Sequence, residues 1–469
     1  MNRYLVLIVA YSALQVALGV WIGRRVRTTS AFFVAGRRLG PGLLFSTLMA
    51  ANIGAGSTVG ASGLGYRDGL SAWWWVGSAG LGSLGLAFLV GPRMRRLSEQ
   101  LDLKTVGDYL EYRYHRSVRG AIAALLWLGT LAILAGQLIA VAWILDVVAG
   151  VPKWAGCMLG GAVMTAYFTA GGLESAAWVN SLQLAVELSC FALLLPVALS
   201  HAGGWHVVAS TAPTPDYWAF WRGGASGWTY AALLAPAFVI SPGLVQKVYG
   251  ARDERTVRLG VGLNAIVLLL FAFVPTLLGM LARARHPELT NPELALPTVL
   301  RYDLPAAFGA FGLAAIFSTE VNTADAILFM LSTSLSQDLY RGFVNRSATD
   351  AQVLRVARWA AVAGGACGVA LAMVAPSVID ALRIFYSLLS VSLFVPLVAG
   401  LYVRRVGTPE AAAAIGGGVS LMLLSHLATG GRGWGAFSPA AIGLVASALA
   451  CAAVAFGRYH RAPAPRGGA

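Results

Sequence analysis

At residues 50–57 the chain reads AANIGAGS, in the middle of an apolar segment that extends from residue 42 to residue 66. Glycine lets the backbone leave helical geometry, and a break at bilayer depth frees amide and carbonyl groups that lipid cannot satisfy. Such a break is therefore expected where the backbone lines a cavity. A simple kink, or close helix packing through small residues, would give the same local pattern.

A second interruption, ISPG at residues 240–243, lies in the apolar segment over residues 227–247. Each interruption opens a block of five apolar segments, so the second block enters the bilayer in the opposite orientation to the first. This is the plan of transporters built from inverted repeats, in which paired broken helices form a solute and ion site near the midplane. The matched spacing favours a cavity over two unrelated kinks.

The composition supports a chain that lies almost entirely in the membrane. Of its 469 residues, 58% are hydrophobic and 12% are charged, against roughly 25% charged in soluble domains. We predict an all-α membrane protein with about thirteen transmembrane helices, a 5+5 inverted repeat and flanking helices. The predicted spans are 3–23, 42–66, 70–91, 119–149, 153–172, 175–200, 227–247, 258–282, 305–335, 356–374, 379–402, 410–428 and 439–457.

The predicted organisation has four parts. Residues 1–41 hold the first helix and a cytoplasmic linker, and residues 42–200 form repeat one. Residues 227–402 form repeat two, and residues 403–469 hold two accessory helices and a short cytoplasmic tail.

Basic residues set the predicted orientation. With the N-terminus outside and the C-terminus in the cytoplasm, 25 of the 34 Lys and Arg residues, Lys247 among them, fall on the inner side. This predicts a multi-pass protein of the plasma (inner) membrane, and it accounts for the net charge of +14 without nucleic acid. The four cysteines lie in apolar segments and suggest no disulfide framework. The sequence leaves the oligomeric state open.

The ninth predicted span contains an unusually polar stretch, FSTEVNTAD at residues 317–325. Thr319, Asn322 and Thr323 fall on one helical face because they are spaced i, i+3 and i+4. Sodium is a hard cation that prefers oxygen ligands, and neutral ones allow its release. Carbonyls of the broken second span and this polar face together predict a sodium site. The alternative is that the hydroxyls bond back to the preceding helical turn.

Acidic residues inside predicted spans are costly and are therefore either functional or paired. Glu320 and Asp325 lie in the polar stretch, and both are candidates for ion coupling. Glu187 and Asp146 have the same two interpretations. Asp325 also fits a position near the cytoplasmic water line.

Short motifs in a consistent order show a family resemblance over about residues 20–405. The chain resembles the sodium:solute symporter family, whose members have thirteen helices and the leucine-transporter fold. The motifs are FVAGRRLG (33–40), AANIG (50–54), GYRDGL (65–70), TVGDYLEYRY (105–114), TAGGL (169–173), Gln183, SP (241–242), QK (246–247), RD (252–253), AD (324–325) and QDLY (337–340).

The resemblance implies a particular sodium site. Its ligands would be the carbonyl oxygens of Ala50 and Ile53 in the broken helix, the carbonyl of Thr319, and the side chains of Asn322 and Thr323. The family usually has a hydroxyl residue at the position of Asn322, although an amide oxygen can also bind the ion. A second alignment, one turn earlier, would use Ser318 and Thr319 instead.

Two further departures bear on coupling and on the solute. The family often has an aspartate, implicated in sodium passage, where this chain has Asn180. Members that bind sugars carry polar side chains at the positions of Gly56 and Ser57, so a sugar is not favoured here.

Candidate solute contacts come from the broken helices and their neighbours. They are Asn52, Ser57, Phe238 and Ser241, with Gln137 and Tyr386 behind them. The family often has an aromatic gate at the position of Phe238, and simple packing is the alternative. The run from Trp73 to Trp75 is interpreted as an interfacial aromatic belt.

The functional prediction is sodium-coupled symport of a small organic solute into the cell by alternating access. Sodium would be a co-transported ligand, and no cofactor is predicted. A proton-coupled or sodium-independent carrier is the alternative, for which Asn180 and Glu320 are the motivating residues. A transporter-like solute sensor is a further alternative, although no fused signalling domain is present in this sequence. An enzyme is not predicted, because no nucleophile–base–orienter set appears.

Overall fold

The computed structural model describes residues 35–170, 173–221 and 227–461. Residues 35, 167, 169, 170, 173–182, 228 and 459–461 are described by their backbone alone. The predicted first span, 3–23, lies outside the described residues.

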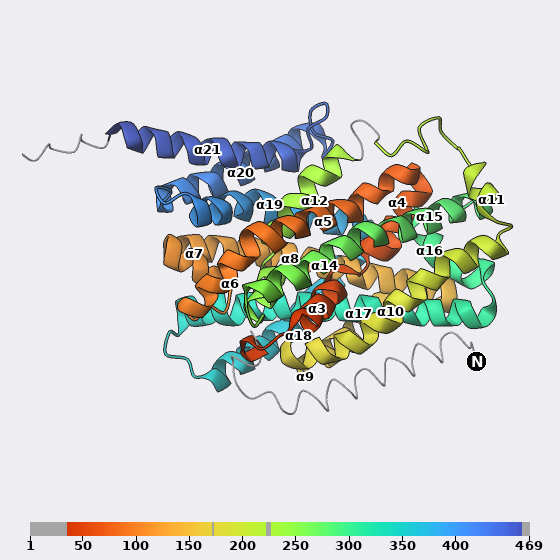
Figure 1. Ribbon diagram of the computed structural model, residues 1–469, viewed down its shortest axis with the longest axis horizontal. Coiled ribbons are helices and arrows are strands. Elements are labelled where there is room, and N and C mark those ends of the chain that lie inside the picture. Colours follow the sequence, from red (N-terminus) through yellow and green to blue (C-terminus); the bar gives the residue numbers. More distant parts are fainter. Residues whose placement is uncertain (1–34, 171–172, 222–226, 462–469) are drawn as a thin grey trace, which may run out of the picture.

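Helices account for nearly all regular structure, and no β-strand is formed in the described ranges (Figure 1). The longer helices are α3 (Pro41–Asn52), α4 (Ala61–Asp68), α5 (Trp73–Gly85), α6 (Gly91–Gln100), α7 (Val106–Arg113), α8 (Arg116–Ala149), α9 (Lys153–Ala170), α10 (Leu173–His201), α12 (Trp228–Ile240), α13 (Pro242–Tyr249), α14 (Glu254–Phe271), α15 (Phe273–Arg285), α17 (Ala306–Thr333), α18 (Asp350–Val374), α19 (Val378–Tyr402), α20 (Thr408–Thr429) and α21 (Pro439–Arg461). Short helical turns complete the set: η1 (Ala35–Arg37), η2 (Gly56–Gly60), η3 (Gly69–Ala72), η4 (Leu86–Val90), α11 (Trp205–Ala209), η5 (Pro292–Leu294), α16 (Ala295–Thr298), η6 (Val299–Asp303) and η7 (Ser334–Val344).

Both predicted helix breaks are confirmed. Helix α3 ends at Asn52, and Ile53 is extended, with φ −91° and ψ 107°, before the chain resumes as η2 and α4. Helix α12 ends at Ile240, and Ser241 turns the chain, with φ −50° and ψ 120°, into α13. Pro242 begins α13 because proline is tolerated in the first helical turn, where its missing N–H has no helical partner.

The twelve predicted spans that fall wholly or mostly on described residues all correspond to helices, with four larger differences, one of which is that the tenth begins at Asp350 and not at residue 356. The third span continues through η4 and α6 to Gln100, and the ninth continues through η7 to Val344. The eighth span is interrupted at Ala272, between α14 and α15. These extensions are polar, so a prediction based on hydropathy did not include them. Among the described residues, ten stretches are long and apolar enough to cross a bilayer.

The two broken helices lie inside the bundle. Helix α3 packs against α10, α14 and α17, whereas α12 packs against α5 and α19. Helix α17 also contacts α8, α10 and α18, and α20 and α21 form a pair at one edge of the bundle (Figure 1). The broken segments are therefore surrounded by protein, which can satisfy the backbone groups that the breaks release.

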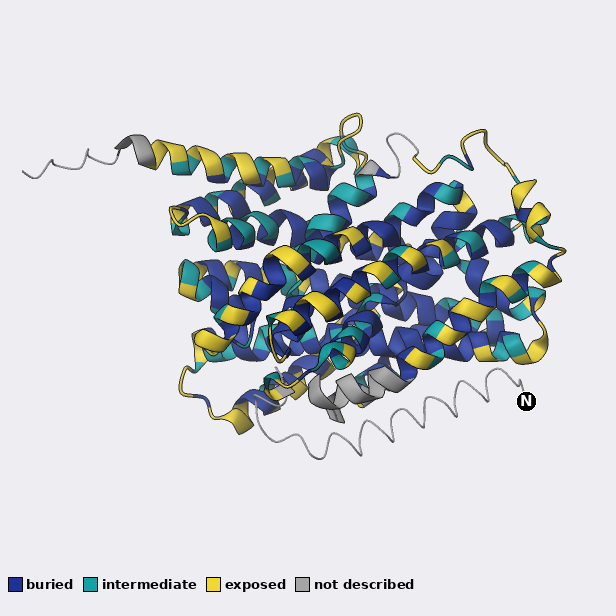
Figure 2. Ribbon diagram, viewed as in Figure 1, coloured by how far each residue is buried: buried dark blue, intermediate teal, exposed yellow. Residues whose placement is uncertain are grey.

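Apolar side chains cover the outside of the bundle as well as its interior. On α14, Leu263, Ile266 and Leu270 are exposed, while Asn264 and Leu268 on the other face are buried. Figure 2 shows exposed and buried residues alternating along the outer helices, with buried residues filling the centre. Large apolar faces of this kind suit lipid rather than water, so the structure agrees with a multi-pass membrane protein.

Candidate functional site

The site is centred on one hydroxyl group that faces the break after α3. The Thr323 Oγ1 atom lies 2.6 Å from the carbonyl oxygen of Ile53 and 3.1 Å from that of Ala50. All three residues are buried, with 4% or less of their surface exposed. The carbonyls at the end of α3 lack helical partners because the helix stops there, and Thr323 brings a side-chain oxygen to them from α17.

A glycine allows this close approach. A Cβ atom added to Gly54 would lie 2.5 Å from Thr323 Oγ1 and 2.7 Å from Thr323 Cβ. The small residue at this point of the break is therefore explained by contact with α17. Gly42, at the start of the same helix, has open space where its Cβ would be.

Two side chains satisfy the amides that the break releases. Ser57 Oγ accepts a hydrogen bond from the Gly54 amide at 2.9 Å and donates to the Asn52 carbonyl at 2.9 Å. The Ala55 amide donates to Gln137 Oε1 on α8 at 2.9 Å. The sequence predicted Ser57 and Gln137 as solute contacts. In this structure, both side chains hold the broken backbone in place.

The polar face of α17 lies where the helical spacing predicted it. Thr319, Asn322 and Thr323 are all buried among protein, and Thr319 Oγ1 donates to the Ala315 carbonyl at 2.9 Å. The Thr319 hydroxyl therefore bonds back to the preceding turn, as the alternative interpretation expected, whereas the Thr323 hydroxyl crosses to α3. Asn322 Nδ2 donates to Glu187 Oε1 on α10 at 2.9 Å.

The acidic candidates have different surroundings. Glu320 Oε1 accepts a hydrogen bond from Thr58 Oγ1 at 2.8 Å, so this carboxyl group lies against the second half of the broken helix. Asp325 is 8% exposed and interacts electrostatically with Lys247 on α13. It is therefore buried inside the bundle. The side chain of Asn180 lies outside the described part of the chain.

Sequence reasoning missed two members of this region, Lys247 and Thr58, and did not identify the partner of a third, Glu187. Lys247 was counted among the cytoplasmic residues, but it is 3% exposed, and its Nζ donates to the Thr47 carbonyl at 2.6 Å. Thr58 on η2 and Glu187 on α10 both contact the polar stretch of α17. The only sequence signal was the cost of placing charged groups inside apolar segments, and it does not identify their partners.

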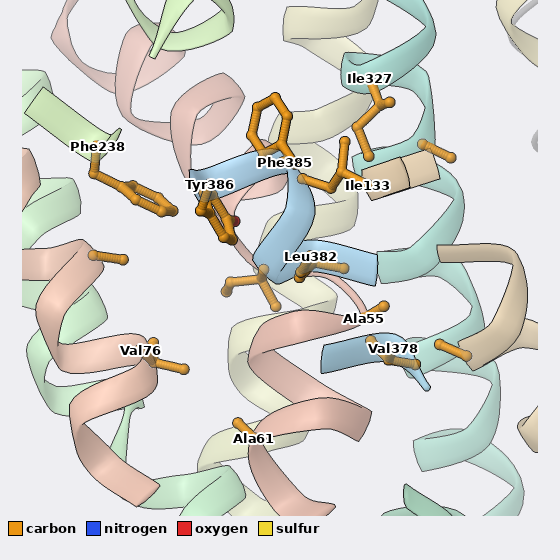
Figure 3. Packing of buried hydrophobic residues seen from close by; sticks show 14 of the residues in the cluster. Ala55, Ala61, Val76, Ile133, Phe238, Ile327, Val378, Leu382, Phe385 and Tyr386 are labelled. Atoms are coloured by element: carbon orange, nitrogen blue, oxygen red, sulfur yellow. The ribbon is translucent and has the colours of Figure 1, made fainter. Parts of the chain in front are cut away.

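The aromatic candidates meet on the other side of the break. The rings of Phe238 and Tyr386 face each other with centroids 5.6 Å apart (Figure 3). Tyr386 also contacts Trp75, with ring centroids 6.1 Å apart. Leu382 from α19 closes over Gly56, where any Cβ would strike its side chain. These residues bring α5, α12 and α19 together beside the break.

The interpretation of Trp73–Trp75 as an interfacial belt is wrong for two of the three residues. Trp75 is 2% exposed and makes an edge contact with Tyr230, with ring centroids 5.3 Å apart. Trp73 is 8% exposed, and only Trp74 is partly accessible, with its Nε1 donating to the Phe220 carbonyl at 2.9 Å. Aromatic residues pack equally well in a protein core and at an interface, so composition alone did not separate the two.

The remaining polar candidates lie near the break without joining the cluster of oxygens. Asn52 Nδ2 donates to Asn264 Oδ1 on α14 at 3.1 Å. Ser241 forms the turn between α12 and α13 and is partly exposed.

A narrow cavity of about 40 Å³ lies between α7, α8, α13 and α17. Gln246, Met330 and Phe385 line it, as do Asp338 and Arg119. Arg119 pairs with Asp338 at 2.8 Å, Asp108 at 2.9 Å and Glu111 at 2.9 Å. This cluster of ion pairs ties α7, α8 and η7 together beside the cavity.

Known proteins resemble the chain along almost its whole length. The sodium/pantothenate symporter of Escherichia coli is 29% identical over 450 residues, which cover 90% of each chain. The human sodium/iodide cotransporter is 25% identical over 447 residues, covering 87% of this chain and 67% of that protein. Both are similar to this chain over most of the bundle.

Solved structures show the same fold. A Na⁺-coupled sialic acid symporter, solved in a substrate-bound outward-open state, matches with a TM-score of 0.80, 19% identity and 99% coverage of both chains. A nucleobase-cation-symport-1 family transporter matches with a TM-score of 0.60 and 13% identity, covering 93% of this chain and 95% of the other. At these identities the matches establish the fold, and they confirm the expected leucine-transporter architecture.

The sequence profile of the sodium:solute symporter family matches residues 32–418. This range contains both broken helices, the polar face of α17 and the cluster around Arg119. The chain therefore belongs to the sodium:solute symporter family.

Proposed function

We propose that this protein takes up a small organic solute together with Na⁺ by alternating access, with the ion bound between the break after α3 and the polar face of α17. Sodium-coupled solute symport follows from membership of the family. The residues proposed here as sodium ligands are the carbonyls of Ala50, Ile53 and Thr319 and the side chains of Asn322 and Thr323.

The observation that carries the proposal is the contact of Thr323 Oγ1 with two carbonyls at the end of α3, at 2.6 and 3.1 Å. These three oxygens are neutral and buried, which suits a hard cation that must also be released. When Na⁺ enters, the Thr323 hydroxyl proton turns away, and the lone pairs of all three oxygens face the ion. Asn322 Oδ1, which has no hydrogen-bond partner among the described residues, is free to serve as a further ligand.

Coupling follows from where these ligands sit in the chain. Two come from the end of α3 and three from α17, so an ion bound between them fastens the broken helix to its neighbour. Without the ion, the break lets the two halves of the helix move relative to α17. A ligand can shift such an equilibrium only by its difference in affinity for the two states, and a site shared by two elements supplies that difference.

Three polar residues are proposed to take part in coupling. Glu320 touches the second half of the broken helix through Thr58, and Asp325 faces Lys247. Asn180 is the third, on the strength of the family resemblance.

The solute is proposed to bind between α5, α12 and α19, against the rings of Phe238, Tyr386 and Trp75. Ser241 and Asn52 offer polar groups from the two breaks, and Ser57 and Gln137 fix the backbone behind them. An aromatic wall with a few polar groups fits a small organic solute that is partly apolar. In the membrane, the N-terminus is proposed to lie outside and the C-terminus in the cytoplasm.

Transport into proteoliposomes tests the proposal. The full-length protein is first screened for metabolites that raise its melting temperature in the presence of Na⁺ and not in K⁺. Uptake of the best candidate is then measured with an inward Na⁺ gradient, with an inward proton gradient, and with neither. We expect uptake only with Na⁺, and uptake that follows the proton gradient and ignores Na⁺ would refute the proposal.

A further inference from the structure

Asn322 is an unusual choice for a sodium ligand, because its side-chain amide has two different ends. The carbonyl oxygen can bind a cation, whereas the NH₂ group donates hydrogen bonds and repels it. The family resemblance leads one to expect a hydroxyl here. A hydroxyl oxygen can always face the ion, because its proton rotates away. The amide must therefore be held with its oxygen toward the break.

Glu187 is placed to do this. It lies on α10, which packs against both α3 and α17, and its side chain is fully buried. Its Oε1 atom is 2.9 Å from Asn322 Nδ2. This carboxyl oxygen accepts the hydrogen bond, so it meets the NH₂ end of the amide and not the carbonyl end. The hydroxyls of Ser318 and Thr319 lie against the same carboxyl group and restrict it further.

The opposite end of the amide is left open. Asn322 Oδ1 is buried and has no hydrogen-bond partner among the residues that the structure describes. A buried carbonyl oxygen without a partner costs about 1–3 kcal/mol, and this atom belongs to the residue immediately before Thr323. A cation at the break would satisfy it.

We propose that Glu187 is a positioning and specificity-determining residue for sodium: it accepts a hydrogen bond from the NH₂ group of Asn322 and so leaves the oxygen of that amide for the ion. This inference rests on the proposed function. Without Glu187, the amide can present either end to the site. With Glu187, the NH₂ group has a fixed partner, and the oxygen of the amide is left for the ion.

A double-mutant cycle with radioactive Na⁺ alone tests the inference without knowledge of the solute. Equilibrium Na⁺ binding to the purified full-length protein is measured for the wild type, Glu187→Leu, Asn322→Ser, and both changes together. We expect Glu187→Leu to weaken binding about tenfold, which is the scale of losing one hydrogen bond to a charged group. In the Asn322→Ser background the same change should weaken binding less than about threefold, because a serine hydroxyl orients itself.

Two further variants serve as an intermediate case and as a control. Glu187→Gln keeps an acceptor but loses the charge and the fixed direction, so its affinity should fall between those of the wild type and Glu187→Leu. Gln183→Leu removes a buried polar group one helical turn away on α10 and should change Na⁺ affinity less than about twofold, because the change is too far away to turn the amide. If Glu187→Leu does not fold, the ranking of wild type above Glu187→Gln still tests the inference.

The outcomes separate the two proposals. A wild-type protein that binds no Na⁺ would overturn the proposed function. Sodium binding in the wild type with an unchanged affinity in both Glu187 variants would overturn only the inference. Equal losses from Glu187→Leu in the wild-type and Asn322→Ser backgrounds would also overturn it, since Glu187 would then act without the amide.

Discussion

Lys247 Nζ donates a hydrogen bond to the carbonyl oxygen of Thr47 at 2.6 Å, and this contact joins the second half of one broken helix to the first half of the other. The ammonium group is buried and has Asp325 of α17 as its charged neighbour. The Lys247 ammonium group therefore links α13, α3 and α17.

We expect Lys247→Met to lower stability, because it leaves Asp325 buried without a compensating charge. Removing one of two interacting buried charges typically costs several kcal/mol, because the other charge is left uncompensated. The double change Lys247→Met with Asp325→Asn should recover most of the loss. Thermal unfolding of the purified proteins in detergent checks this, and equal melting temperatures for the single and double variants would contradict it.

Thr323→Ala is expected to raise the Na⁺ concentration for half-maximal uptake about tenfold, since it removes one proposed ligand. Thr323→Ser keeps the hydroxyl and should stay within about threefold of the wild type. The measurement is solute uptake into proteoliposomes over a series of Na⁺ concentrations. An unchanged Na⁺ dependence in Thr323→Ala would remove this residue from the site.

Gly54→Ala is expected to abolish or strongly reduce Na⁺-dependent uptake. The added methyl group would lie 2.5 Å from Thr323 Oγ1, so either the break or α17 must shift. Gly42→Ala is the matched control, because it adds the same methyl group to α3 where the space is open. Similar uptake by the two variants would show that the close approach at Gly54 is unimportant.

Arg119→Ala is expected to destabilise the protein by about 3–5 kcal/mol, because it strands the buried carboxylate of Asp338. Arg96→Ala removes an exposed ion pair with Glu254 and should cost less than about 1 kcal/mol. Thermal unfolding of both variants provides the comparison. Equal melting temperatures would show that the Arg119 cluster does not hold α7, α8 and η7 together.

The sequence by itself determined the membrane character, the two breaks and the polar face of α17. Each is a local property: Gly and Pro act on the backbone where they occur, and residues 319, 322 and 323 share a face because of the helical period alone. The family motifs likewise indicated the fold, and the profile match and structural matches confirm it. The exact count of thirteen helices and the boundaries of the two repeats stay predictions.

Only the tertiary structure decided which polar groups face one another. Asn322 and Glu187 are 135 residues apart, and Lys247 and Thr47 are 200 apart, so no spacing rule links them. The burial of Trp75 was equally inaccessible to sequence reasoning. The physical reason is that lipid and protein interior are both apolar, so hydropathy locates a helix in the membrane but does not fix its rotation about its own axis. That rotation, set by packing against neighbouring helices, brings Glu187 to Asn322.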